Sequence, residues 1–181
     1  MGAVQPKDIE PFLSSRSREG SRQYEMTSKN FVVFSIENQR YALNLENVRR
    51  IVRAVEVTPL PDAPEAILGV IDVQGQVIPV VDTRRRLGLP CREIELSDQF
   101  IIVQDSDLTL AFVADEVLPV MEVPEAQVAS SDRLLPGEGM VKGLARVDDG
   151  MIVVLSTERL LSREERQDVS SALLEAVEEM Q

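Results

Sequence analysis

The chain has 181 residues with a formal net charge of -12, and it contains neither histidine nor tryptophan. An acidic surface repels nucleic-acid phosphates and anionic lipid, so nucleic acid and membrane insertion are not expected. Without histidine the chain cannot be a histidine kinase or phosphocarrier, and it lacks the residue on which Ser-His-Asp, Cys-His and most zinc sites depend. Composition therefore argues against the commonest catalytic mechanisms.

The chain shows no signal for export. Its N-terminus lacks an apolar signal segment, and no apolar run approaches the roughly 20 residues that span a bilayer. Cys91 is the only cysteine, which excludes an intrachain disulfide and suits a reducing compartment. We therefore expect a cytoplasmic protein.

Residues 1–29 are expected to form a disordered N-terminal arm. The stretch 14–22 is rich in serine and arginine and has no apolar period. A tail without a structural role is the favoured interpretation, and a regulated docking arm is the alternative.

A hairpin and a helical turn are predicted directly after this arm. Residues 31–36 and 40–43 are apolar runs separated by a polar turn, which is typical of two paired strands. Asn44 is expected to cap a short helical turn that follows. Prolines then occur three times within residues 59–64. Because proline donates no hydrogen bond to a strand ladder, this stretch must be an irregular crossover.

A second hairpin and a short helix complete the first half of the chain. Residues 69–73 and 76–81 predict two strands joined by a two-residue turn. Asp82 is expected to cap a short helix over residues 83–87.

The second half repeats this order. Residues 100–103 and 108–113 predict a hairpin, and residues 143–147 and 151–155 predict another around an Asp-Asp-Gly turn. Ser156 is then expected to cap a short helix.

The repeat extends to the spacing of the elements. Two pairs of windows have equal lengths of 17 and 13 positions: Phe31 to Val48 with Phe100 to Val117, and Gly69 to Asp82 with Gly143 to Ser156. The repeat predicts a mainly β fold of two small barrels, each with about five strands and one terminal helix. Because the core of each unit alone would be marginal, we expect the two barrels to pack together.

Residues 162–181 are predicted to form a C-terminal amphipathic helix. Ser162 and Glu165 match a capping box at its start. The apolar residues that follow recur at helical spacing and form one stripe: Val169, Leu173, Val177 and Met180. Docking of this stripe on the barrels is favoured, and binding of a partner is the alternative.

No catalytic residue, cofactor or metal site is predicted. The aspartates that could suggest a cation site lie in hairpin turns, where local hydrogen bonds favour this residue: Asp105, Asp107, Asp148 and Asp149. Cys91 has no histidine to activate it and is interpreted as an ordinary loop cysteine. The basic run 84–86 is interpreted as a solvated helix face, with contact to an acidic partner as the alternative.

An ordered set of motifs resembles the CheW-like domains of chemotaxis coupling proteins. The resemblance covers residues 30–165 and rests on these segments: Asn30-Phe31-Val32-Val33-Phe34, Tyr41-Ala42-Leu43, Val48-Arg49-Arg50-Ile51, Gly69-Val70-Ile71, Gly75 to Asp82, Arg84 to Gly88, Val113-Ala114-Asp115-Glu116-Val117, Lys142-Gly143 and Leu155 to Leu161. Each segment alone is a weak signal, and their order and spacing make the set specific.

The resemblance implies two SH3-like barrels of five strands, the first over about 30–90 and the second over about 98–161. It also implies a non-catalytic adaptor that couples the cytoplasmic tip of chemoreceptors to the regulatory domain of a CheA-type histidine kinase. Such a protein would be a cytoplasmic monomer in isolation, recruited to membrane-associated receptor arrays. Receptors would lie in a groove between the barrels, and the kinase would contact the barrel ends. By position, the receptor-facing residues would be Val48, Arg50, Ile51, Gly69, Gln74, Gly75, Phe100, Val117 and Val120.

Two positions depart from the family pattern. The family has an acidic residue where this chain has Arg50, and an arginine where it has Gln74. The double change avoids the repulsion of two basic residues and is tolerable for folding. It leaves open an alternative function, a CheW-like interaction module in a non-flagellar chemosensory or localisation pathway. A hydrolase or a ligand-binding barrel is a further alternative, disfavoured by the missing histidine.

Overall fold

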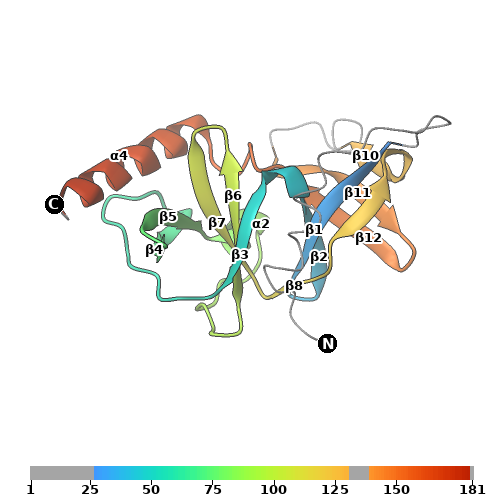
Figure 1. Cartoon of the computed structure of the whole chain (residues 1–181), viewed down its shortest axis with the longest axis horizontal. Helices are drawn as coiled ribbons and strands as arrows, with labels where there is room; N and C mark the ends of the chain where they lie inside the picture. The colour runs from blue at the N-terminus through green and yellow to red at the C-terminus, as the bar shows by residue number, and fades with distance from the viewer. Residues whose placement is uncertain (1–26, 131–138, 180–181) are drawn as a thin grey trace.

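The structure is a computed structural model that describes residues 27–130 and 139–179. The predicted arm 1–29 lies almost entirely outside the described residues. Two β-sheets stand side by side, and the long C-terminal helix lies over one of them (Figure 1). The predicted mainly β fold with a C-terminal helix is confirmed.

Seven strands in the described part of the chain form the first sheet, called sheet A: β1 (Ser28–Ile36), β2 (Gln39–Asn44), β8 (Glu116–Val117), β9 (Met121–Pro124), β10 (Val128–Ser130), β11 (Val141–Val147) and β12 (Gly150–Leu155). Five form sheet B: β3 (Val48–Arg53), β4 (Ile67–Val73), β5 (Gln76–Val81), β6 (Gln99–Asp105) and β7 (Leu108–Ala114). The helical segments are η1 (Leu45–Asn47), α2 (Thr83–Leu87), η2 (Glu125–Gln127) and α4 (Arg163–Glu179).

The two sheets do not follow the predicted division into residues 30–90 and 98–161. Hairpin β4–β5 of the first half joins sheet B through a parallel pairing of β5 with β7, whereas hairpin β11–β12 of the second half joins sheet A through β12 and β2. The two halves have therefore exchanged their second hairpins. A sequence repeat identifies equivalent strands, but it carries no information about which copy each strand pairs with.

The equivalences predicted by the repeat do appear in these parallel pairings. In sheet B, Val80 lies opposite Ala111, and in sheet A the equivalent residue Val154 lies opposite Ala42. Val80 and Val154 each lie 11 residues after the glycine near the start of their hairpin, Gly69 and Gly143. The exchange therefore preserves the internal alignment of the halves.

The core has three parts because the central strands are buried on both faces. Val32 and Phe34 of β1, with Ile101 and Val103 of β6, belong to one cluster that both sheets share. Phe31 and Val33, which alternate with them along β1, belong to a second cluster on the other face of β1. Phe100 of β6 belongs to a third cluster, within sheet B. This explains the unbroken apolar runs at these strands, since a strand covered on both sides needs no polar alternation.

The short helix α2 forms as predicted, whereas its counterpart in the second half does not. Asp82 Oδ1 accepts a hydrogen bond from the Arg85 N–H at 3.2 Å, and Gly88 ends the helix with a φ of 70°. Residues 157–161 instead form turns and bends, so the prediction that Ser156 caps a helix is wrong. The sequence Ser-Thr-Glu fits a cap, but the chain must turn at once to start α4.

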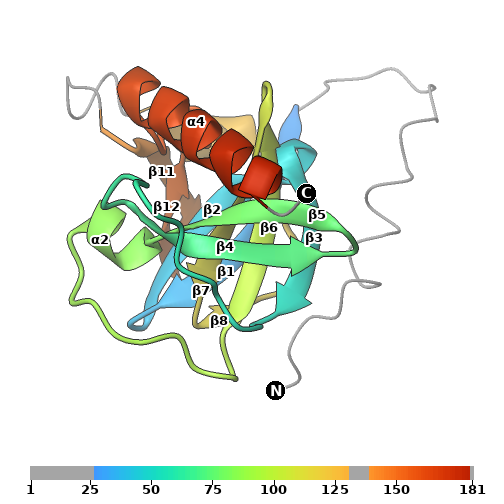
Figure 2. The same ribbon diagram turned by 90° about the vertical axis from the view of Figure 1, so that its left-hand side faces the viewer.

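Helix α4 docks mainly through its first half. Its capping box is confirmed, with Ser162 and Glu165 exchanging hydrogen bonds of 2.8 and 3.1 Å. Val169 is fully buried, but Val177 of the predicted stripe is 40% exposed and Leu174 is 66% exposed. Met180 lies outside the described residues. The helix crosses sheet B (Figure 2). The exposure of Leu174 and Val177 shows that its C-terminal half is only partly packed.

Two glycines permit a close crossing of backbones at equivalent places. A Cβ on Gly69 would lie 2.3 Å from the Thr58 carbonyl oxygen, and one on Gly143 would lie 2.3 Å from that of Ala129. A β-bulge precedes each glycine, between Ile67 and Gly69 in one hairpin and at the equivalent place in the other. Only glycine fits a position where another backbone approaches this closely.

Alanine at Gly69 or at Gly143 is expected to lower the free energy of unfolding by about 1–3 kcal/mol, because the methyl group would overlap a backbone oxygen. Gly139→Ala is the matched control, since a Cβ there would meet nothing within 4 Å. Chemical denaturation of the three variants measures the effect. Equal stability of all three variants would show that both backbone crossings have room for a methyl group.

Candidate interaction surface

A cluster of charged side chains joins the two sheets at the base of α2. Arg84 donates to Asp115, with Nη2 2.8 Å from Oδ1, and also to Glu37 in the turn between β1 and β2. Arg92 donates to the same Asp115 oxygen at 2.8 Å and to Asp98 at 2.7 Å. The cluster thus links α2, the β1–β2 turn of sheet A and the start of β6 in sheet B.

The prediction that residues 84–86 form a solvated helix face is wrong for Arg84, which is only 8% exposed. Arg86 is half-buried and pairs with Glu165 of α4, while Arg85 is exposed and pairs with Glu65. The sequence could not distinguish these roles, because the carboxylate partners of Arg84 and Arg86 lie 31 or more residues away.

The buried carboxylate of Asp98 remains charged because of its hydrogen bonds. Burial alone would raise its pKa, but donation from Arg92 and from the Glu95 N–H outweighs it, and the pKa of Asp98 is lowered. The hydrogen bond with Asp98 correspondingly raises the pKa of Arg92. For Glu165, burial is likewise outweighed by hydrogen bonds from Ser162 and Arg86, so the pKa of this carboxyl is lowered.

Asp98→Asn is expected to cost about 1–3 kcal/mol of stability at pH 7, because it removes the charged partner of Arg92. A lowered folded-state pKa contributes stability above the unfolded value of about 4 and loses it as the pH falls further. The difference between wild type and variant should therefore shrink below about pH 4 in denaturation at pH 7 to 2.5. Asp168→Asn, on the exposed face of α4, is the control. A difference that stays constant across this range would contradict the assignment.

The nine residues predicted to face a receptor differ widely in burial. Four of them belong to or pack against the core shared by the sheets: Val48, Ile51, Val117 and Val120. Phe100 is fully buried inside sheet B, and Gly69 lies at the backbone crossing. Arg50 is half-buried, and Gln74 and Gly75 are exposed in the β4–β5 turn. Among these nine, the exposed or half-buried side chains are the ones that a partner can touch directly.

The repeat creates two equivalent hollows, one beside each sheet. Each hollow is lined by the residue at the β-bulge of a hairpin and by the residue that follows that hairpin. These residues are Leu68 and Asp82 for hairpin β4–β5, and Lys142 and Ser156 for hairpin β11–β12. Val57 and Val128 occupy a further equivalent position. We call these the sheet-B hollow and the sheet-A hollow.

The sheet-B hollow is the larger and more apolar of the two, at about 730 Å³. Three large apolar side chains at its edge are unusually exposed: Val55 at 47%, Leu68 at 39% and Leu96 at 90%. Acidic residues surround them, namely Glu56, Glu93 and Glu95. Apolar side chains gathered at a surface and rimmed by polar ones are typical of a protein-interaction site. Sequence reasoning missed this site because its residues come from connections rather than from motifs.

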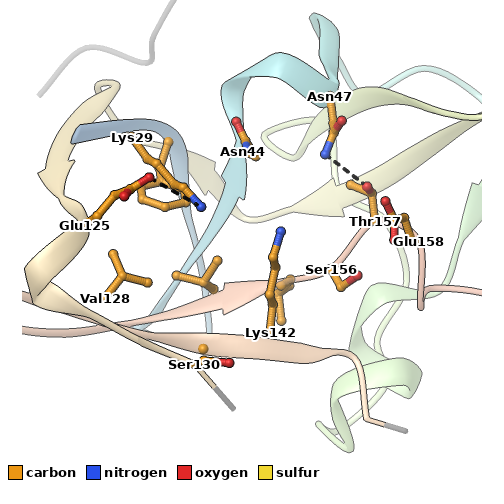
Figure 3. A pocket seen from close by; sticks show the side chains of 14 residues that line it. Lys29, Asn44, Asn47, Glu125, Val128, Ser130, Lys142, Ser156, Thr157 and Glu158 are labelled. Atoms are coloured by element: carbon orange, nitrogen blue, oxygen red, sulfur yellow. Dashed lines mark hydrogen bonds and ion pairs between the residues drawn. The ribbon is translucent and has the colours of Figure 1, made fainter. Parts of the chain in front are cut away.

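The sheet-A hollow has about 350 Å³ and a mixed lining. Its apolar wall consists of Phe31, Val128, Val154 and Leu155. Polar side chains from β1, η1, β11 and the turn after β12 point toward the same space (Figure 3). In the described part of the chain, no three acidic, cysteine or histidine side chains are grouped so that they could hold a metal ion.

Fold and surface define a mainly β protein of two intertwined halves with an exposed apolar hollow. A CheW-like domain matches residues 30–165, which is most of the chain. The chain belongs to the CheW-like family.

Known relatives agree with this membership. The chemotaxis protein CheW of Thermotoga maritima is 27% identical over 128 residues, covering 71% of this chain and 84% of that protein. CheW of Bacillus subtilis is 26% identical over 143 residues, covering 78% and 92%. The crystal structure of the scaffolding protein TtCheW from Thermoanaerobacter tengcongensis superposes with a TM-score of 0.69 at 28% identity, covering 77% of this chain and 96% of that one. No described helix of this chain is long and apolar enough to cross a membrane.

Proposed function

We propose that this adaptor of chemotaxis signal transduction binds the cytoplasmic tip of a chemoreceptor and the regulatory domain of a CheA-type histidine kinase. The observation that carries the proposal is the exposed apolar sheet-B hollow on a CheW-like fold. Binding would occur at the cytoplasmic side of receptor arrays. The protein would act by shape and contact and would catalyse no reaction.

The relatives support the chemotaxis function over a non-flagellar or localisation pathway. Their names place them in chemotaxis. The alternative rests only on Arg50 and Gln74, which differ from the family pattern. Those two positions bear on the choice of receptor, whereas the fold and the sheet-B hollow do not depend on them.

Titration of the purified chain against each partner separately tests the proposal. A CheA regulatory domain and a receptor tip from the same organism should each bind with a Kd of about 10 μM or less, comparable with weak signalling complexes. Isothermal titration calorimetry provides both affinities. Failure of both titrations would overturn the coupling function and leave the family membership intact.

We further propose that the sheet-B hollow receives the kinase domain, since its exposed apolar side chains offer the kind of surface that protein partners bury. Leu96→Asp is expected to weaken kinase binding by at least tenfold, because it puts a charge into an apolar contact. Leu96 is 90% exposed, so the fold should be unaffected.

Leu174→Asp on α4 is the matched control, since Leu174 is also exposed, at 66%, but lies outside the hollow. The same calorimetric titration compares the two variants. If both weaken kinase binding equally, or neither does, the kinase does not occupy this hollow.

Gln74→Arg is expected to strengthen binding to an ordinary receptor tip several-fold, because it restores the charge of the family pattern. Gln74 and Gly75 have φ values of 53° and 85°, a type I′ turn, and arginine replaces glutamine there without a new backbone cost. Gln76→Arg, also exposed but on β5, is the control for added charge. Unchanged affinity for the Gln74 variant would show that this position does not select the receptor.

A further inference from the structure

The hydroxyl of Ser156 lines the sheet-A hollow and makes no hydrogen bond to the described residues. Ser156 is 8% exposed, and among the described residues its Oγ neither donates nor accepts a hydrogen bond. Its repeat equivalent, Asp82, uses its carboxylate to cap α2. Because no helix follows Ser156, its hydroxyl is left to face the hollow. An accessible hydroxyl in a hollow can exchange its water for a ligand oxygen.

A lysine ammonium reaches the same space. Lys142 is the residue at the β-bulge between Val141 and Gly143. Bulges redirect a side chain, and this one points Lys142 into the hollow beside Ser156 (Figure 3). Within residues 27–130 and 139–179 its ammonium has no ion-pair or hydrogen-bond partner.

The remaining polar groups of the hollow add donors. Asn44 Oδ1 accepts from the Glu46 N–H at 3.2 Å, so the amide nitrogen of Asn44 is the atom free to donate. Lys29 and Glu125 are 4.0 Å apart and offset each other's charge. Glu158 is exposed at the rim, where solvent weakens its repulsion of an anion. An amide, a hydroxyl and an ammonium beside an apolar wall suit a ligand with acceptor oxygens, a negative charge and a short apolar group.

We propose that the sheet-A hollow binds a carboxylate that carries a small apolar group. Lys142 and Ser156 donate to the carboxylate, and the apolar wall covers the rest. Such a carboxylate has two sources, a free organic acid or the acidic side chain of a partner peptide. This site does not depend on the proposed coupling of receptor and kinase.

Titration of the isotope-labelled protein with benzoate, followed by amide chemical shifts, tests the site. Saturable shifts at Gly143 and at residues 155–157 are expected, and benzamide, which has the same shape without the charge, should bind at least tenfold more weakly. The blocked dipeptide acetyl-Val-Asp-amide is the second probe. Binding of benzoate alone identifies a free acid, and binding of the dipeptide identifies a partner side chain. Binding of neither overturns the proposal.

Variants connect the shifts to the proposed residues. Lys142→Met should weaken binding about tenfold and Ser156→Ala about fivefold, which is the range for charge-assisted and neutral hydrogen bonds. Glu158→Gln should strengthen it. Arg146→Met is the control, because it removes a positive charge from the exposed side of the same strand β11. Equal binding of benzoate and benzamide, or an Arg146→Met effect as large as that of Lys142→Met, would overturn the proposal.

Discussion

The parallel contacts between hairpins of opposite halves are the constraint on which the rest of the structure depends. Val80 beside Ala111 and Val154 beside Ala42 place each second hairpin in the sheet begun by the other half. Neither sheet can therefore be completed by one half of the chain. The shared core follows from this exchange, because β1 and β6 then have sheet on both sides. A chain with two small repeats thus folds as one unit, which relieves the weakness of a core of about 60 residues.

Local structure could be predicted from the sequence, and long-range pairing could not. Turns, caps and hairpins depend on nearby residues, so Asp82 with α2 and Ser162 with Glu165 were predictable. The exchange of hairpins depends on contacts between distant segments whose apolar patterns are equivalent, and either pairing satisfies that pattern. The helix expected after Ser156 failed for a related reason, since its cap signal competed with the start of α4.

The interaction surfaces were harder to predict than the fold. The residues predicted to face a receptor came from a family resemblance, and five of them have side chains that are buried or packed in the cores: Val48, Ile51, Phe100, Val117 and Val120. A buried position affects a partner through the shape of its strand. Leu96 could not be predicted from the sequence, because one exposed leucine in a loop forms no pattern. It becomes part of an apolar surface only because Val55 and Leu68 line the same hollow.

Duplication leaves two equivalent hollows, and the chain has given them different chemistry. The position occupied by Leu68 beside sheet B is Lys142 beside sheet A, and Asp82 is replaced by Ser156. The charged cluster around Arg84 and Asp115, with the shared core, ties together the two sheets beside which these hollows lie. An adaptor needs this rigidity, because the entropy of ordering two loose surfaces would weaken the binding of both partners. The ion pairs of this cluster therefore serve geometry as well as stability, because they join α2, the β1–β2 turn and the start of β6.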